Sequence, residues 1–178
     1  MLRSNPTVAP PGRQATVTES AFDTILDEHI GLISRIVATF ETNSAICDDL
    51  KQEVALALWR AAPSWRGDCT LRTFVARVAH NVCVSHVRRV VREPKRSELS
   101  DTLPSDREGP EDSVERADLS RRLTTAVATL PAGSREVAML MLEGFSTQEI
   151  ALTLGINEGA VSTRATRARA ALREAMVT

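Results

Sequence analysis

Hydroxyl and guanidinium side chains cluster on one face of a predicted helix near the C-terminal end of the chain. Ser162, Thr163, Thr166 and Arg167 share this face at helical spacing, and Arg164 lies at its flank. Arginine donates paired hydrogen bonds to guanine, and short hydroxyls reach phosphates or either type of base. These side chains are typical of a helix that reads duplex DNA. The competing interpretation is an ordinary solvated cationic face.

A second group has the chemistry to follow a nucleic-acid backbone and to hold one base. Arg77, Asn81 and Arg88 recur at helical spacing, and a loop over residues 65–70 precedes their helix. Cationic side chains bind phosphates, and an amide can hydrogen-bond a base edge. A basic surface stripe without a partner is the alternative, which the residue types alone leave open.

A third stripe mixes charged and amide side chains with one leucine, on a helix predicted from about Asp48 to Ala61. Leucine supplies apolar burial at an interface, and charges set the register and the rate of association. The pattern indicates a helix that docks on another protein, whereas the alternative is a solvated helix face. The stripe consists of Asp49, Gln52, Glu53, Leu56 and Arg60.

The elements that must position these groups are helices, and the best defined is a helix-turn-helix. Ser146 and Glu149 stand three residues apart, as in a capping box that starts a helix. Gly155 is a helix stop, and Asn157 is a good N-cap for the next helix. Two short helices joined by a tight turn place the second one in the major groove. The inward stripe of that helix is Val161, Ala165, Ala168 and Leu172.

The sequence predicts an all-α fold of two small helical domains joined by a flexible acidic linker. Residues 1–20 should be a disordered tail, 21–96 the first domain, 97–118 the linker and 119–178 the second domain. Helical periodicity dominates both domains, and the linker has too few large apolar groups to order itself. We expect the domains to fold separately and to be loosely joined without partners.

Charge is nearly balanced overall, with 22 Lys and Arg against 23 Asp and Glu. The balance hides two basic modules, over residues 66–96 and in the C-terminal helix, around the acidic linker. Such modules favour nucleic-acid partners, and the linker is expected to shield them in the free protein. No apolar run is long enough to span a membrane. Three cysteines fit no disulfide framework, which favours a cytoplasmic protein.

Candidate enzyme and metal chemistry is weak. No paired carboxylates, phosphate loop or nucleophile–base arrangement occurs at a telling spacing, so we expect no catalytic residues and no cofactor. His80, Cys83 and His86 are zinc-ligand types on one helix, but the usual structural zinc spacings are absent. We therefore expect no metal. A redox or metal role for these three residues, Cys47 or Cys69 is left open.

Four segments resemble parts of the bacterial RNA polymerase sigma factors of the extracytoplasmic-function (ECF) class. The run DDLKQEV at 48–54 resembles their region 2.2, and LRTFVARVAHN at 71–81 resembles regions 2.3 and 2.4. The runs GFSTQEIA at 144–151 and GAVSTR at 159–164 are similar to region 4 of the same family. Two separate motifs in the family's order make the resemblance more specific than the helix-turn-helix alone.

The resemblance implies a protein that binds core RNA polymerase, at its β′ clamp and β flap, and directs it to promoter DNA. Region 2 of the family recognises and melts the −10 element, and region 4 reads the −35 element. An anti-sigma factor is a further candidate partner. The residues expected to bind core polymerase are Asp49, Gln52, Glu53, Leu56 and Arg60; those for −10 DNA are Arg66, Arg72, Phe74, Arg77, Asn81, Arg88 and Arg89; those for −35 DNA are Ser162, Thr163, Arg164, Thr166 and Arg167.

The chain departs from the family pattern at a few of these positions. Phe74 stands where the family usually has tryptophan, and Ser162 where it commonly has a cation. Weaker stacking near Phe74 should make promoter melting depend more on the exact −10 sequence, and Ser162 should shift the −35 preference. The alternative function is a free-standing helix-turn-helix regulator whose N-terminal domain is a sensor.

Overall fold

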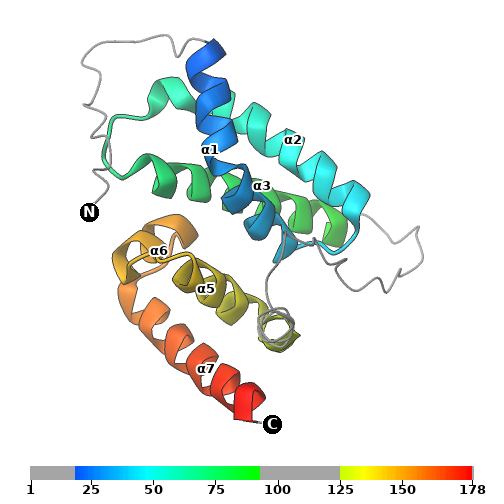
Figure 1. The fold of residues 1–178 in the computed structure, drawn as a ribbon, viewed down its shortest axis with the longest axis vertical. Coiled ribbons are helices and arrows are strands. Elements are labelled where there is room, and N and C mark those ends of the chain that lie inside the picture. The colour runs from blue at the N-terminus through cyan, green and yellow to red at the C-terminus, as the bar shows by residue number, and fades with distance from the viewer. Residues whose placement is uncertain (1–18, 93–124, 178) are drawn as a thin grey trace, which may run out of the picture.

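The regular elements of the protein are helices wherever its structure is described. The computed structural model describes residues 19–92 and 125–177, in agreement with the all-α prediction (Figure 1). The predicted acidic linker, 97–118, lies outside these ranges. So does the predicted tail, except for residues 19 and 20, which open the first helix. None of the described helices combines the length and hydropathy needed to cross a membrane.

The N-terminal domain consists of α1 (Glu19–Ala38), α2 (Ser44–Ala61), the 3-10 turn η1 (Ala62–Ser64) and α3 (Leu71–Arg92), with α1 lying across the other two helices (Figure 1). Each of the three long helices contacts the other two. Their shared core is made of aliphatic side chains that are almost completely buried, and burial of such groups drives the packing. It includes Ile33, Ile36, Leu50, Val54 and Val75.

Local caps fix where the helices of this domain begin. The Asn43 side chain accepts hydrogen bonds from the backbone N–H groups of Ala45 and Ile46, so α2 starts at Ser44 rather than at about Asp48. The Thr70 hydroxyl accepts from the N–H of Thr73 at 3.1 Å and caps α3 in the same way. Side-chain caps of this kind satisfy N–H groups that the helix itself leaves unpaired.

The C-terminal domain holds α5 (Ala132–Leu142), α6 (Thr147–Leu154) and α7 (Glu158–Val177), and residues 125–129 are helical before them. The predicted capping box is confirmed, because Ser146 and Glu149 bond each other's backbone N–H groups. Gly155 has φ = 65°, the left-handed conformation that glycine adopts without steric cost. Asn157 accepts from the N–H of Ala160 at 2.8 Å. The helix-turn-helix therefore forms from the signals that predicted it.

The two domains pack against each other, in contrast to the loose arrangement expected from the sequence. Helix α6 lies on α3, and α5 touches α1 (Figure 1). Buried residues of both domains, among them Phe74 and Ile150, belong to one hydrophobic cluster. Linker composition reports nothing about surface complementarity between the domains it joins, so this packing left no signal in the sequence.

Candidate nucleic-acid interface

The stripe predicted to dock on another protein is presented on the outside of α2. All five residues of the stripe are exposed, and Leu56 has an exposed fraction of 57%. Trp59 lies on the same side of the helix, 45% exposed, with its ring edge-on to Phe22 at 5.0 Å between centroids. Trp59 was not among the expected site residues, although a tryptophan beside a polar stripe is itself an interface signal.

Helix α3 presents the predicted basic stripe. Arg77, Asn81 and Arg88 are exposed, as expected. Near the C-terminal end of the helix, Ser85, Arg88, Arg89 and Arg92 line an open hollow on the surface. Arg89 also lies 3.5 Å from the Glu53 carboxylate, so one residue of the expected −10 set pairs with one of the docking stripe. This cationic and amide surface suits a single strand that runs along the helix.

The loop before α3 is held in place by its own tryptophan. The Trp65 indole N–H donates to the Cys69 carbonyl at 3.2 Å, which closes the loop around Gly67, whose φ is 81°. The Trp65 ring lies 6.3 Å from that of Phe74, and the guanidinium of Arg77 lies 5.9 Å from the Phe74 ring centroid. Phe74 was expected at the DNA, but it is only 5% exposed. In this structure Phe74 packs beneath the surface, against Trp65 and Arg77.

The recognition face of α7 is open. Ser162, Thr163, Thr166 and Arg167 are exposed on the side opposite the buried Val161–Ala168 stripe. The Thr163 hydroxyl donates to the Gly159 carbonyl at 3.0 Å, and the Thr166 hydroxyl donates to the Ser162 carbonyl at 2.9 Å. With their protons used inside the helix, both hydroxyl oxygens remain as acceptors, which match the amino groups of cytosine and adenine better than phosphates.

Arg164 behaves differently from Arg167. Its side chain is half-buried and lies against the N-terminal turn of α5. A Cβ atom at Gly133 would come within 3.1 Å of the guanidinium carbon, so the absence of a side chain there makes room for it. Arg164 therefore sits at the flank of the recognition face, as predicted, with its charge close to the edge of α5.

Arg72 is the member of the expected −10 set that the C-terminal domain engages. Its guanidinium bonds the Glu143 carboxylate at 3.2 Å and lies 4.4 Å from the centroid of the Phe145 ring. Both partners belong to the turn between α5 and α6. The remaining exposed members of the set, including Arg66, lie outside these contacts.

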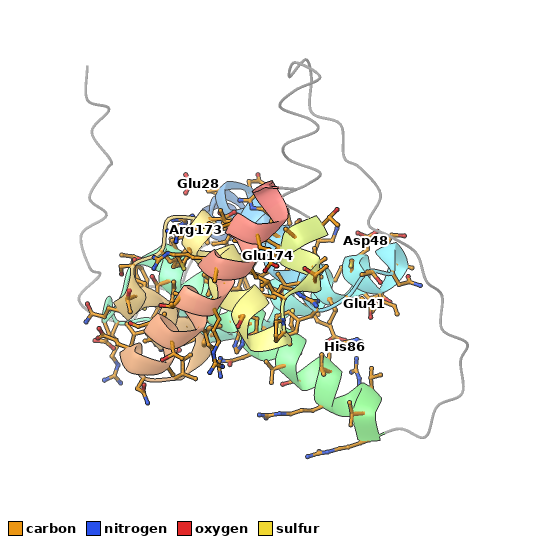
Figure 2. The ribbon with its side chains drawn as sticks, turned by 90° about the horizontal axis from the view of Figure 1, so that it is seen from below. Glu28, Glu41, Asp48, His86, Arg173 and Glu174 are labelled. Carbon is orange, nitrogen blue, oxygen red and sulfur yellow. The ribbon has the colours of Figure 1, made fainter. Side chains whose placement is uncertain are left out.

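The histidines and cysteines do not assemble into a metal site. Within residues 19–92 and 125–177, no three potential ligands gather to hold an ion. His80 instead lies 3.2 Å from Glu136, and His86 lies 3.7 Å from Glu41, a pair visible in Figure 2. Burial raises the pKa of the Cys83 thiol to about 12. Burial, followed by the nearby Glu41, also raises the pKa of Cys47. Neither thiol is a reactive thiolate at neutral pH.

Each domain matches a known family model. A sigma-70 region 2 model matches residues 25–93, and a sigma-70 region 4 model matches residues 120–172. The chain is 31% identical over 159 residues to the ECF RNA polymerase sigma factor SigM of Mycobacterium tuberculosis, covering 85% of this chain and 75% of SigM. It is 34% identical over 147 residues to SigD of Mycobacterium bovis, covering 79% and 68%.

Solved structures with a similar fold include CnrH in complex with the cytosolic domain of CnrY, with a TM-score of 0.64, 25% identity and 92% coverage of both chains. The sigma factor RpoE of Bartonella quintana, in complex with the anti-sigma factor NepR, has a TM-score of 0.66 at 19% identity, covering 88% of this chain and 97% of RpoE. At that identity, the second comparison concerns the fold alone.

Region 2 followed by region 4, with the helix-turn-helix in the second, defines a sigma-70-type transcription factor. More narrowly, the chain belongs to the ECF RNA polymerase sigma factors. Members of this family are regulatory proteins of transcription initiation rather than enzymes.

Proposed function

We propose that this ECF sigma factor docks on core RNA polymerase through α2, holds the melted −10 strand along α3, and reads the −35 duplex with α7. The observation that carries the proposal is the placement of the three candidate faces on three separate helices. The α2 stripe, the Arg77–Asn81 side of α3 and the recognition face of α7 are all exposed. Each face can therefore meet a different partner at the same time.

The chemistry of each face fits the partner assigned to it. The α2 stripe combines carboxylates with Leu56 and Trp59, as a protein interface requires. The α3 stripe offers an amide at Asn81 between arginines, which suits a flipped base within a backbone track. On α7, Arg167 supplies paired donors for guanine, and Thr163 and Thr166 supply acceptors for base amino groups.

The match to region 2 also favours this function over the free-standing regulator, because it accounts for the N-terminal domain without a sensor role. We further propose that a restraining protein partner binds this sigma factor. The support is that the similar CnrH structure is a complex with the cytosolic domain of another protein, CnrY.

In vitro transcription with core polymerase on a library of genomic fragments, with the start sites sequenced, tests the function. The protein should give new start sites that share −35 and −10 sequences, and it should bind promoter DNA poorly without polymerase. Sequence-specific binding without polymerase, combined with no new start sites, would favour the free-standing regulator.

Charge reversal on α2 tests whether this helix docks on core polymerase. Replacing Asp49 and Glu53 with lysine reverses two charges on the docking face, which should weaken polymerase binding by roughly tenfold or more. Asp23 and Asp27 form the matched control, because both are exposed, on α1, at the same four-residue spacing. A double variant that competes for core polymerase as well as the wild type does would refute docking through α2.

A further inference from the structure

Three glutamates of the C-terminal domain contact the N-terminal domain. Glu136 lies 3.2 Å from His80, and the Glu149 carboxylate accepts from the Thr73 hydroxyl at 3.1 Å. Glu143, in the turn after α5, is paired with two arginines. The acidic side chains thus meet α1 and the first half of α3, where the chain was expected to bind the −10 strand.

Glu143 has the strongest contacts of the three. Both of its carboxylate oxygens bond the Arg35 guanidinium, and Oε2 also accepts from Arg72. Arg72 donates in addition to the Glu143 backbone carbonyl, and its guanidinium lies over the Phe145 ring. The Glu143 side chain is only 14% exposed, which limits screening by solvent, while the two arginines are about half-exposed. Charge-assisted bonds in such a site are stronger than neutral ones.

The contact covers one side of α3 and leaves other candidate faces open. Arg72, Ala76 and His80 follow each other at four-residue spacing on the covered side, and Ala76 is completely buried. Among the described helices, α2 touches no helix of the C-terminal domain, and α7 touches only α5 and α6. The closed arrangement therefore withholds Arg72 while it leaves the docking stripe and the −35 face accessible.

This arrangement cannot persist on a promoter. The −35 and −10 elements are about 25 base pairs apart, or roughly 85 Å of duplex. A compact body of this size is only about 35–40 Å across. To read both elements at once, the domains must separate, and separation breaks the contacts of Glu143.

The contact surface between the two domains contains polar atoms that lack hydrogen-bond partners. His80 Nδ1, Arg135 Nε and Thr153 Oγ1 are buried there without a hydrogen-bond partner in the described part of the chain. His80 and Thr153 line a small cavity between the domains. Unpaired buried polar atoms cost free energy and reduce the stability of the closed form. Such a boundary suits a contact that has to open.

We propose that Glu143 is an autoinhibitory latch: its carboxylate takes the place of a DNA phosphate on Arg72 and holds the free protein closed. Release of the latch, when polymerase or DNA separates the domains, returns Arg72 to the −10 strand. The proposal rests on the proposed function for the identity of that strand. The closure itself does not depend on it.

Small-angle X-ray scattering of the full chain tests the closure. Glu143→Arg places a third cation beside Arg35 and Arg72, so it should enlarge the radius of gyration and lengthen the maximum dimension. Glu28→Arg is the matched control, because Glu28 is an exposed glutamate on α1 that takes no part in the pairs of Glu143 with Arg35 and Arg72. If Glu143→Arg scatters like the wild type and the control, Glu143 does not hold the domains together.

Binding of a single-stranded −10 oligonucleotide to the free protein tests the release of Arg72. The apparent affinity scales with the population of the open form, so Glu143→Gln should bind roughly tenfold more tightly. Arg35→Gln removes a positive charge, which by simple electrostatics weakens DNA binding. The latch predicts the opposite result, tighter binding. The double variant should gain little over either single one, because both remove the same pair.

Weaker binding by Arg35→Gln would overturn the latch, as would a Glu143→Gln affinity equal to that of the Glu28→Gln control. Either result can coexist with normal transcription by the wild type on core polymerase. Conversely, expansion of Glu143→Arg in solution without any promoter-directed transcription by the wild type would refute the proposed function and leave the closure intact.

Discussion

Individual polar side chains on α3 and α7 differ in how accessible their hydrogen-bonding groups are to DNA. Asn81 is exposed, and its side chain is placed between arginines on a helix whose other side forms the core. Arg167 extends from the open face of α7, whereas Arg164 lies on Gly133. Residues of the same chemical type therefore differ in burial and in neighbours, and we expect them to differ in role as well.

Asn81→Ala should impair open-complex formation and blur the preference at one −10 position. An amide bonded to a base edge contributes about 1–3 kcal/mol of discrimination. Folding should be unchanged, because the side chain is exposed and the Ser85 hydroxyl bonds only the Asn81 backbone carbonyl. A permanganate footprint and a −10 mutational profile measure both effects, with Asp23→Ala, at an exposed position on α1, as the control. Wild-type profiles in Asn81→Ala would count against the base contact.

Arg167→Ala and Arg164→Ala should fail in different ways. Loss of Arg167, which we propose contacts base edges, should cost roughly 1–3 kcal/mol on the preferred −35 sequence and relax one position. Loss of Arg164, at the flank, should weaken all sequences about equally and reduce the salt slope by about one unit. A randomised −35 element over a salt series separates the two. If Arg167→Ala keeps the sequence profile and loses only salt dependence, α7 is rotated relative to our placement.

At the scale of elements, the helix-turn-helix was predictable because its signals are local. Ser146, Glu149, Gly155 and Asn157 act on backbone groups within four residues, so their types and spacing determine the caps and the turn. The start of α2 was predicted too late because the cap at Asn43 was overlooked. Local rules carry most of the fold of each domain.

The residues that could not be predicted act over long separations. The Arg35–Glu143 pair joins positions 108 residues apart, and no periodicity or composition links them. Phe74 lies in the first turn of the predicted −10 helix and was expected at the DNA, but packing of the helices buries it. Site residues on regular faces were thus predictable as patterns, whereas their burial and partners depend on tertiary packing.

The capping box should give α6 a pH-dependent stability. Glu149 accepts from the Ser146 backbone N–H at 2.9 Å, and this bond is the main reason that its pKa is lowered in the fold. Because the folded pKa lies below the unfolded one, the carboxylate stabilises the protein above the usual pKa of about 4.3. This contribution is lost as the pH falls through the lowered value.

Glu149→Gln should therefore cost about 1 kcal/mol of unfolding free energy at pH 7, and the difference from wild type should shrink below about pH 4. Urea unfolding over a pH series measures it, with the exposed Glu28→Gln as the control. A difference that stays constant from neutral to acidic pH would mean that the ionised carboxylate contributes nothing to the cap.

At the scale of the whole molecule, the shared cluster makes the two domains one folding unit in the closed form. Side chains from α1, α2 and α3 lie in the same cluster as those of α5, α6 and α7. Neither small domain alone buries a large core, and small cores are marginally stable. Packing of the two domains against each other therefore stabilises both. A substitution that destabilises one domain should also lower the unfolding temperature of the other.

Val161→Ala tests this coupling, because Val161 is 1% exposed on α7, a helix that touches only α5 and α6 among the described helices. Both tryptophans of the chain, Trp59 and Trp65, lie in the N-terminal domain, so their fluorescence reports that domain alone. The substitution should cost roughly 1–3 kcal/mol, or about 2–4 °C in Tm for each kcal/mol.

Coupled domains should show the same Tm shift in tryptophan fluorescence and in far-ultraviolet circular dichroism. Among the described helices, α7 makes no contact with the N-terminal domain, so the effect has to reach the tryptophans through α5, α6 and the turn between them. Ser162→Ala, an exposed neighbour on the same helix, should shift neither signal. If Val161→Ala lowers a circular dichroism transition while the fluorescence transition stays in place, the domains unfold independently and the closed form does not persist in solution.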